Sequence, residues 1–260
     1  MRIQHNITAL NSHRNLTNNN SSLTKNLEKL SSGYRINRAG DDAAGLAISE
    51  KMRAQITGLQ TAQKNAEDGV SLVQTAEGAL TEVHSMLNRM VELATQSANG
   101  TYSSTNRNEM QKEITALKNE IDRISNTANF NGTTLFKGFT SKAVAIHAGE
   151  TSSANNQIKI TLKQMSSSGI GDTNTGVTGV DISTQTGATA AINVINDAID
   201  AVSSLRSDFG ALQNRLEHTI NNLGVQTENL SAAESRIRDV DMAKEMMAYT
   251  KNNILVQASQ

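Results

Sequence analysis

The sequence contains no cysteine, no proline and no tryptophan, and aromatic residues make up only 3% of its 260 positions. The absence of cysteine excludes disulfides, thiolate catalysis and cysteine-ligated zinc. The absence of proline is what long, uninterrupted helices require. A shortage of aromatic rings argues against a wide spherical core. It favours thin layers of helices that pack through leucine, isoleucine, valine, methionine and alanine.

The chain also lacks an excess of either charge and lacks long apolar runs. Lysine and arginine number 24 against 25 aspartates and glutamates, for a net charge of −1. This balance argues against a nucleic-acid-binding surface or a basic membrane patch, and it permits self-association. No apolar run reaches the roughly 18 residues of a membrane span. The Asn- and Thr-rich N-terminus has no apolar segment typical of a cleavable secretory signal. We therefore expect neither nucleic acid nor a membrane as a partner.

The most informative segment runs from residue 52 to residue 98. Two neighbouring apolar stripes follow it at helical spacing. The first stripe comprises Met52, Ile56, Leu59, Ala66, Val70, Val73, Leu80, Leu87, Val91, Ala94 and Ala98, and the second comprises Leu72, Ala76, Ala79, Val83, Met86, Met90 and Leu93. Two stripes make a wider face than a two-stranded coiled coil needs, so this helix must contact at least two neighbours. At ~1.5 Å per residue it would be roughly 70 Å long.

Two further segments show the same helical periodicity. Apolar residues recur every three or four positions from Met110 to Ala128, in a helix short enough to fold back antiparallel on the first one. The pattern returns from residue 188 to residue 240, which as a helix would be roughly 75 Å long. Segments of matching length predict two long helices that lie side by side. Asp41 or Asp42 is the expected N-cap of the first long helix, and Gly100 is its expected C-terminal cap.

A short β element is predicted between the helices. Residues 143–147 and 157–162 alternate apolar and polar side chains and predict a β-hairpin. Residues 165–187, rich in serine, glycine and threonine, predict a loop or linker in which Val180–Ile182 is a candidate short strand. The predicted fold class is mainly α: an elongated rod of long antiparallel heptad helices, a coiled-coil bundle, with a small β-hairpin.

Both ends of the chain have weaker helical patterns. At the N-terminus, Ile3, Ile7 and Leu10 begin an apolar stripe that Leu23, Leu27 and Leu30 resume after a register shift. At the C-terminus, residues 242–256 have a similarly weak apolar pattern among polar residues. Asparagine and serine dominate the N-terminal pattern, and both compete with helical hydrogen bonds. Helices of this kind are only marginally stable in isolation. We expect the ends to be disordered in the monomer and to become ordered against a partner. The alternative for the N-terminal residues 3–38 is a flexible arm.

No catalytic or metal-binding motif is found. The five histidines are scattered without the HExxH spacing of a zinc site, and no P-loop or GxSxG motif occurs. Gly169-Ile170-Gly171 lacks the third glycine of a dinucleotide-binding loop. We predict that the protein is not an enzyme and binds no cofactor. Two hypotheses remain, a self-polymerising filament subunit and a cytoplasmic coiled-coil scaffold, and the marginal ends favour the first.

Three long, ungapped stretches carry a specific resemblance. They are residues 28–59 (EKLSSGYRINRAGDDAAGLAISEKMRAQITGL), residues 65–101 and residues 210–260. Together they resemble bacterial flagellin, the subunit of the flagellar filament, and the likeness extends over about residues 1–140 and 188–260.

The resemblance implies a division of the chain into domains. Residues 1–42 and 235–260 would form the two halves of an inner-tube helical domain. Residues 43–164 and the helix at 188–234 would form a rod domain, with residues 165–187 as a short variable loop. The polymerisation residues would be Ile3, Ile7, Leu10, Leu23, Leu27, Leu30, Val240, Met247, Ile254 and Leu255.

The resemblance also implies a function and partners. The chain would polymerise with copies of itself into an extracellular flagellar filament for motility. It would be secreted by the flagellar type III route without a cleaved signal peptide. Its other partners would be the export apparatus, an export chaperone, and cap and junction proteins. The family continues past the position of Gln260 with an apolar end, so we expect these 260 residues to polymerise poorly.

A second implied partner is the host Toll-like receptor 5. Arg89, Leu93 and Glu113 match the positions at which the family contacts this receptor. A purely structural interpretation is also available, in which Leu93 packs in the second apolar stripe and Arg89 and Glu113 form an ordinary surface pair.

Overall fold

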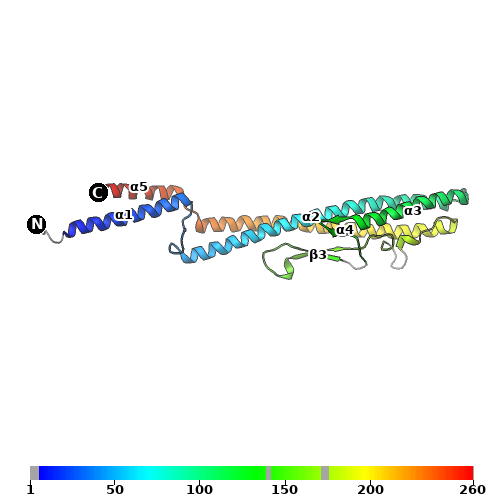
Figure 1. The fold of residues 1–260 in the computed structure, drawn as a ribbon, viewed down its shortest axis with the longest axis horizontal. Helices are drawn as coiled ribbons and strands as arrows, with labels where there is room; N and C mark the ends of the chain where they lie inside the picture. The colour runs from blue at the N-terminus through cyan, green and yellow to red at the C-terminus, as the bar shows by residue number, and fades with distance from the viewer. Residues whose placement is uncertain (1–5, 139–141, 171–175, 260) are drawn as a thin grey trace. The chain divides into compact units, whose positions relative to one another are not determined.

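The computed structural model describes residues 6–138, 142–170 and 176–259 (Figure 1). Its long helices are α1 (Ile7–Ser32), α2 (Ala43–Ala98), α3 (Ser104–Thr127), α4 (Gln185–Arg238) and α5 (Met242–Ser259). Two short antiparallel strand pairs and two 3₁₀ turns (Ala154–Asn156 and Gly176–Gly179) accompany them. The predicted class, mainly α with long antiparallel heptad helices and a small β-hairpin, is confirmed. The chain forms two compact units, residues 61–223 and residues 1–60 with 224–260.

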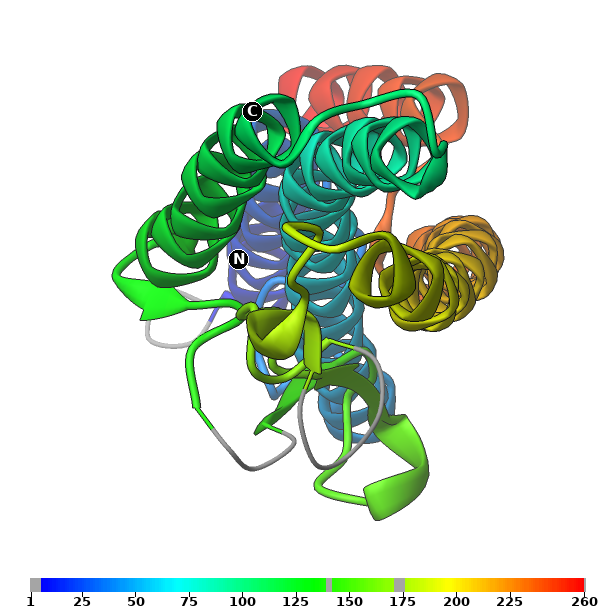
Figure 2. The same cartoon turned by 90° about the vertical axis from the view of Figure 1, so that its right-hand side faces the viewer.

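The hydrophobic core lies in residues 61–223. There α2, α3 and α4 lie side by side, with α3 and α4 antiparallel to α2 (Figure 2). Residues of both predicted stripes of α2 are buried, among them Val73 and Leu87 of the first and Val83 and Met90 of the second. They join Ile114 and Ile121 of α3 and a row on α4 in one continuous cluster. The α4 row comprises Ala188, Ala191, Ile195, Ala198, Val202, Leu205, Phe209 and Leu216.

Side chains define the ends of the first two of these helices. The Asp42 carboxylate accepts a hydrogen bond from the Gly45 N–H at 2.9 Å, which confirms an aspartate N-cap for α2. At the other end, the Arg107 side chain donates to the carbonyl oxygens of Ser97 (2.8 Å) and Asn99 (3.0 Å). The Ser97 carbonyl lies in the last turn of α2 and has no partner within the helix, so Arg107 satisfies it. Through its second hydrogen bond, to Asn99, Arg107 also closes the turn into α3.

The predicted hairpin is also confirmed. Strand β3 (Lys142–His147) pairs antiparallel with β4 (Gln157–Leu162), with Val144 opposite Ile160 and Ile146 opposite Ile158. Side chains along β4 alternate between exposed and buried, and the buried ones join the helical core. Gly69 of α2 allows a close approach, because a Cβ at that position would lie 3.2 Å from Cγ1 of Ile146.

A second, smaller hairpin was not predicted. Strand β1 (Asn129–Phe130) pairs with β2 (Thr133–Thr134) around Asn131 and Gly132, which have φ values of 48° and 77°. Left-handed conformations at both central residues are typical of a two-residue hairpin turn, for which Asn-Gly is the favoured sequence. The signal was therefore present in the sequence.

The predicted short strand at Val180–Ile182 is wrong. The segment is not a strand, although Val180 and Ile182 are buried. Side chains of the helices bind its backbone instead. Lys118 donates to the carbonyl oxygen of Val180 (2.5 Å), and Ser97 donates to that of Ile182 (2.6 Å). The Ile182 N–H donates to the Gln111 side chain at 2.8 Å. With these groups satisfied, the segment has no need of a neighbouring strand.

The Ser-rich segment before it is fixed in the same way. The backbone N–H and hydroxyl of Ser167 both donate to the Asp122 carboxylate, at 2.7 and 2.8 Å. Ile170 and Val177 are fully buried in the core cluster. The described part of residues 165–184 is thus a packed loop rather than a solvent-exposed linker.

Candidate assembly interface

The unit formed by residues 1–60 and 224–260 is built around two paired breaks in the helices. Helix α1 ends at Ser32, and Gly33 caps it with a left-handed φ of 76°. Beside it, the chain breaks between α4 and α5. The Val240 N–H donates to the Gly33 carbonyl at 3.0 Å, and the Arg35 N–H donates to the Arg238 carbonyl at 2.6 Å. Paired in this way, the two breaks set α1 and α5 side by side.

Arg238 reinforces this junction through its side chain. Its guanidinium donates to Glu50 of α2 at 2.6 Å and lies over the ring of Tyr34, 4.7 Å from the centroid. The Arg35 side chain donates to the Ile237 carbonyl. The hydrogen bond from Arg238 is the main reason why the pKa of Glu50 lies below its usual value. A charged network therefore links both helix breaks to the start of α2.

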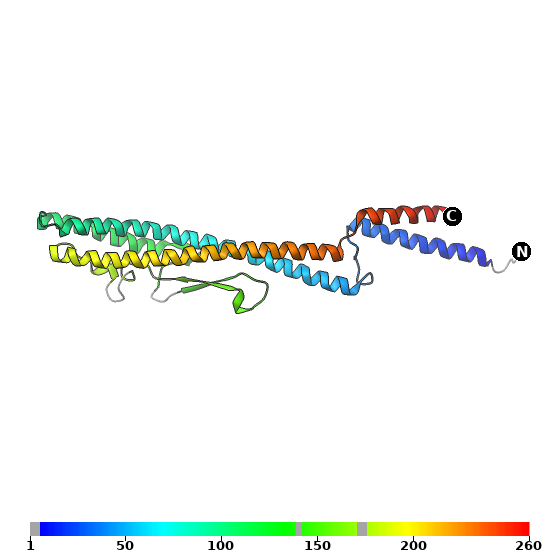
Figure 3. The same ribbon diagram turned by 180° about the vertical axis from the view of Figure 1, so that it is seen from behind.

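Helices α1 and α5 form an antiparallel pair (Figure 3). Apolar side chains that are half-buried in this pair include Leu23 and Leu30 of α1 and Val256 of α5. The Asn26 amide, oriented to satisfy both of its polar atoms, donates to Glu245 at 3.1 Å and accepts from Asn252 at 2.9 Å. No residue of the pair whose burial is described is fully buried. The contact is therefore largely polar and thin.

Large apolar side chains lie on the surface of this pair. Their exposed fractions run from 40% at Leu255 to 67% at Met247. The set comprises Ile7, Leu10, Leu27, Met242, Met246, Met247, Ile254 and Leu255, which we call the terminal apolar surface. It includes six of the ten predicted polymerisation residues. Leu23, Leu30 and Val240 are half-buried, and Ile3 lies outside the described residues.

The unit that carries this surface has almost no core of its own. Of all the buried hydrophobic residues described, only Ile36 and Leu59 belong to residues 1–60 and 224–260. Burial of apolar surface is the main source of folding free energy. A segment of this size with two buried hydrophobic residues gains little of this free energy from its own contacts.

The three predicted receptor-contacting residues fall into two environments. Arg89 of α2 donates to Glu113 of α3 and to Glu92, both at 2.8 Å, and these hydrogen bonds, chiefly that to Glu113, raise its pKa. Arg89 and Glu113 are exposed. Leu93 is only 2% exposed and packs in the core. The structure thus brings Arg89 and Glu113 together at the surface, while the Leu93 side chain supports the helix beneath them. The receptor role of all three stays a prediction.

Within the described residues, no group of three or more histidine, aspartate or glutamate side chains is arranged to hold a metal ion. Over the same part of the chain, no helix combines the length and the apolarity that a membrane span requires.

Comparison with known proteins supports the sequence resemblance. Residues 3–141 match the family model of the bacterial flagellin N-terminal helical region, and residues 192–260 match that of the C-terminal helical region. A flagellin of Bacillus subtilis is 51% identical over 100% of this chain and 94% of its own length. A flagellin of Halalkalibacterium halodurans is 52% identical over 100% of this chain and 93% of its own length. The crystal structure of Bacillus cereus flagellin is similar with a TM-score of 0.52 and 33% identity, covering 66% of this chain and 94% of that one.

Proposed function

This chain belongs to the bacterial flagellins and is a structural subunit of the flagellar filament, and we propose that it polymerises through the terminal apolar surface on α1 and α5. The observation that carries this proposal is the contrast between the two units. Residues 61–223 hold nearly all the buried hydrophobic residues, whereas the exposed ones are concentrated on the terminal helices.

The free energy available from this surface is substantial. Full burial of a leucine, isoleucine or methionine side chain contributes about 1.5–3 kcal/mol. Six of the predicted polymerisation residues are described with exposed fractions of 40% or more, so each has roughly 1 kcal/mol still to gain on assembly. This gain adds to the helical hydrogen bonds and the α1–α5 contacts, which together oppose the entropy of ordering the two helices. Folding of the ends is then coupled to polymerisation.

Coupled folding also fits a route of secretion. Ends that remain unfolded until they are buried would keep the subunit soluble and able to pass through a narrow export channel. Because the chain is a flagellin, we propose the flagellar type III apparatus, an export chaperone, and cap and junction proteins as further partners. The proposed location is extracellular, in the filament.

Charge substitutions on α1 test the assembly role. Leu10→Asp places a carboxylate on the terminal apolar surface, and Ser21→Asp places the same charge on an exposed polar position of the same helix. Burial of an unpaired charge costs several kcal/mol. Relative to the weak seeded growth expected of the unchanged chain, Leu10→Asp should abolish filament growth and Ser21→Asp should retain it. Sedimentation and electron microscopy provide the readout. Equal growth of both variants would exclude this surface. A discrete dimer with protease-resistant ends would favour a coiled-coil scaffold instead.

A second proposed function is recognition by Toll-like receptor 5, which the exposed Arg89–Glu113 pair favours. An arginine bonded to carboxylates on two helices presents a rigid charged surface. We expect Arg89→Ala and Glu113→Ala to weaken receptor activation while thermal stability changes little, because exposed ion pairs contribute little to stability. Leu93→Ala should lower stability by about 2–5 kcal/mol, because it empties a buried site. Unchanged activation by both surface variants would exclude this contact.

A further inference from the structure

Within the part of the chain that the structure describes, no strand covers the second edge of β4. The sheet that contains it has two strands, β3 and β4. The Ala148 N–H donates to the Asn156 carbonyl at 2.7 Å. This hydrogen-bonded pair directly follows the His147–Gln157 pair at the end of the two strands. Hydrogen-bonded and non-hydrogen-bonded pairs alternate along an antiparallel ladder. Ile158 and Ile160 therefore bond to β3, whereas Lys159 and Thr161 direct their backbone N–H and C=O groups away from it. These outward groups have no hydrogen-bond partner among the described residues.

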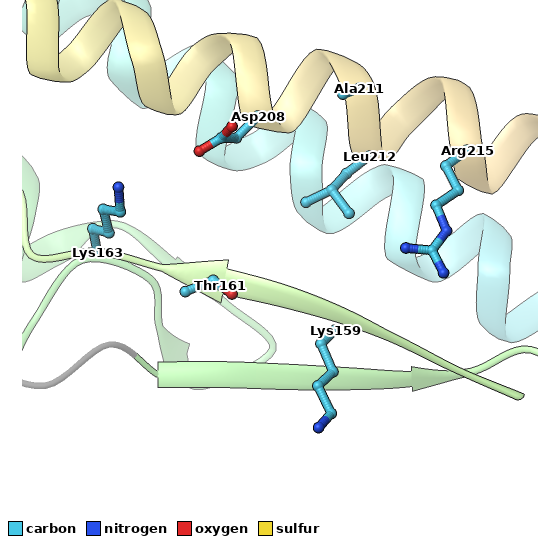
Figure 4. Close-up of a pocket in the computed structure, with 7 residues that line it drawn as sticks. All are labelled: Lys159, Thr161, Lys163, Asp208, Ala211, Leu212 and Arg215. Atoms are coloured by element: carbon cyan, nitrogen blue, oxygen red, sulfur yellow. The ribbon is translucent and has the colours of Figure 1, made fainter. Parts of the chain in front are cut away.

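A groove of about 350 Å³ runs along this edge (Figure 4). Lys159, Thr161 and Lys163 line it on the hairpin side. Helix α4 forms the other wall, with Leu212 pointing towards the hairpin and Ala211 beside it. No residue of β3 lines the groove, so it lies on the side of β4 opposite its partner strand.

The groove has an excess of positive charge. Lys163 and Arg215 extend into it beside a single carboxylate, that of Asp208. The side chain of the fourth charged lining residue, Lys159, runs across β3 and away from α4 (Figure 4). The side chains of these four residues form no ion pair or hydrogen bond within the described part of the chain. Lys163 and Asp208 extend into the space between the hairpin and α4 from opposite walls (Figure 4). The unpaired cations complement a ligand that carries carboxylates. The unpaired backbone groups of β4 beside them complement a ligand whose own backbone is extended.

We propose that the free edge of β4 binds an extended acidic peptide segment of a partner protein as an added strand. Backbone hydrogen bonds to Lys159 and Thr161 would supply affinity, as in other cases of strand addition. Successive side chains of a strand point to opposite faces. One set of peptide side chains would lie beside Lys159 and Thr161, where carboxylates are favoured as cross-strand partners of lysine. The other set would face Ala211 and Leu212, where small apolar side chains fit. The preferred sequence therefore alternates glutamate or aspartate with valine or alanine.

This site is separate from the terminal apolar surface. All the lining residues belong to residues 61–223, whereas the proposed polymerisation helices lie in the other unit. Binding at the groove is therefore tested independently of filament assembly.

A labelled peptide provides the direct test on the full chain. The probe is fluorescein-labelled Thr-Glu-Val-Glu-Val-Glu-Thr, titrated as monomer and followed by fluorescence anisotropy. Two control peptides match it: one has N-methyl groups on alternate backbone amides, and one has lysine in place of glutamate. We expect binding that weakens with salt, slowed hydrogen exchange of the Lys159 and Thr161 amides, and no comparable binding of either control.

Variants of the chain locate the site. Thr161→Pro removes one outward N–H and leaves the ladder to β3 intact, because proline is tolerated where the N–H faces away from a partner strand. Lys159→Glu reverses one cation without changing the backbone. We expect each to weaken peptide binding about tenfold. Lys137→Glu, a charge reversal at an exposed lysine outside the groove, should change it less than about twofold.

Several outcomes would overturn the proposal. Equal binding of the N-methylated peptide would show that charge acts without strand pairing, as would competition by inorganic phosphate alone. Equal binding to wild type and to Lys159→Glu would place the contact elsewhere. An absence of binding at millimolar peptide would exclude the site, whether or not Thr161→Pro folds.

Discussion

Replacement of Gly69 by alanine tests how closely the β3–β4 hairpin packs on helix α2. A Cβ at this position would lie 3.2 Å from Cγ1 of Ile146 and 3.5 Å from Cδ1 of Leu216. Gly78 lies on the same helix, but a Cβ there meets no atom within 4 Å. The two glycines are therefore a matched pair, with the same helical context and different surroundings.

The two substitutions should have opposite effects. Alanine in place of a helical glycine stabilises by about 0.5–1 kcal/mol. Gly78→Ala should show this gain in full. At Gly69 the new methyl crowds a packed site, and overpacking costs about 1–3 kcal/mol. The net effect of Gly69→Ala is thus a loss of about 0–2.5 kcal/mol, which leaves it at least about 1 kcal/mol less stable than Gly78→Ala.

Urea unfolding followed by circular dichroism measures both variants as shifts in the transition midpoint at constant slope. The double variant with Ile146→Ala adds a control. Removal of the Ile146 methyl groups should make Gly69→Ala more favourable than it is alone, a coupling that only contacting residues show. If Gly69→Ala stabilises as much as Gly78→Ala, the hairpin does not pack on α2 as described.

Three further predictions concern the loop, the junction and the core. Lys118→Ala removes the hydrogen bonds to the carbonyl oxygens of Thr178 and Val180. It should lower the free energy of unfolding, measured in urea, by about 1.5–3 kcal/mol. Glu50 has a lowered pKa in the folded state, so the stability it adds to the junction is present above its unfolded value of 4.5. That stability is lost as the pH falls through the lower folded pKa. A circular dichroism titration should show this acid loss in the wild type and less of it in Glu50→Gln. Phe209→Ala should cost about 3–5 kcal/mol, whereas Leu27→Ala, at an exposed position, should stay within about 0.5 kcal/mol in the free chain. Thermal unfolding of Phe209→Ala and Leu27→Ala measures both stability changes relative to the wild type.

The long helices were predictable because their apolar periodicity extends over many turns. The two stripes of α2 supply buried residues such as Leu80 and Leu93, and the α4 pattern supplies Phe209 and Leu216. Such repetition tolerates a single polar residue within a stripe, such as His84 between Leu80 and Leu87. The β3–β4 hairpin was predictable for the same reason, since its alternation of exposed and buried positions is regular.

The loop between β4 and α4 was not predictable, because polar residues on a distant helix determine it. Gln111, Lys118 and Asp122 of α3 have the composition of an ordinary exposed face. Only the fold brings the backbone of Ser167, Val180 and Ile182 against them. The small hairpin at Asn131-Gly132 is different, because its turn signal is local and specific.

The candidate assembly interface was predictable in part. The apolar residues of the two ends were identified from the sequence, and six of them are exposed on the α1–α5 pair. The register of that pair depends on the junction, where Arg238 contacts Glu50 and Tyr34. These residues are far apart in the sequence and form no local pattern. The division between outward residues such as Leu27 and half-buried ones such as Leu23 therefore required the structure.

Hydrogen exchange of the monomer and the filament, read by mass spectrometry, tests the central claim most directly. The claim is that residues 7–32 and 242–259 become stably folded only when their exposed apolar side chains are buried in the assembly. The account predicts fast exchange of these helices in the monomer, beside slow exchange around Leu80 and Phe209, and strong protection of all of them in the filament. Terminal helices already protected in the monomer, or still exchanging fast in the filament, would contradict it.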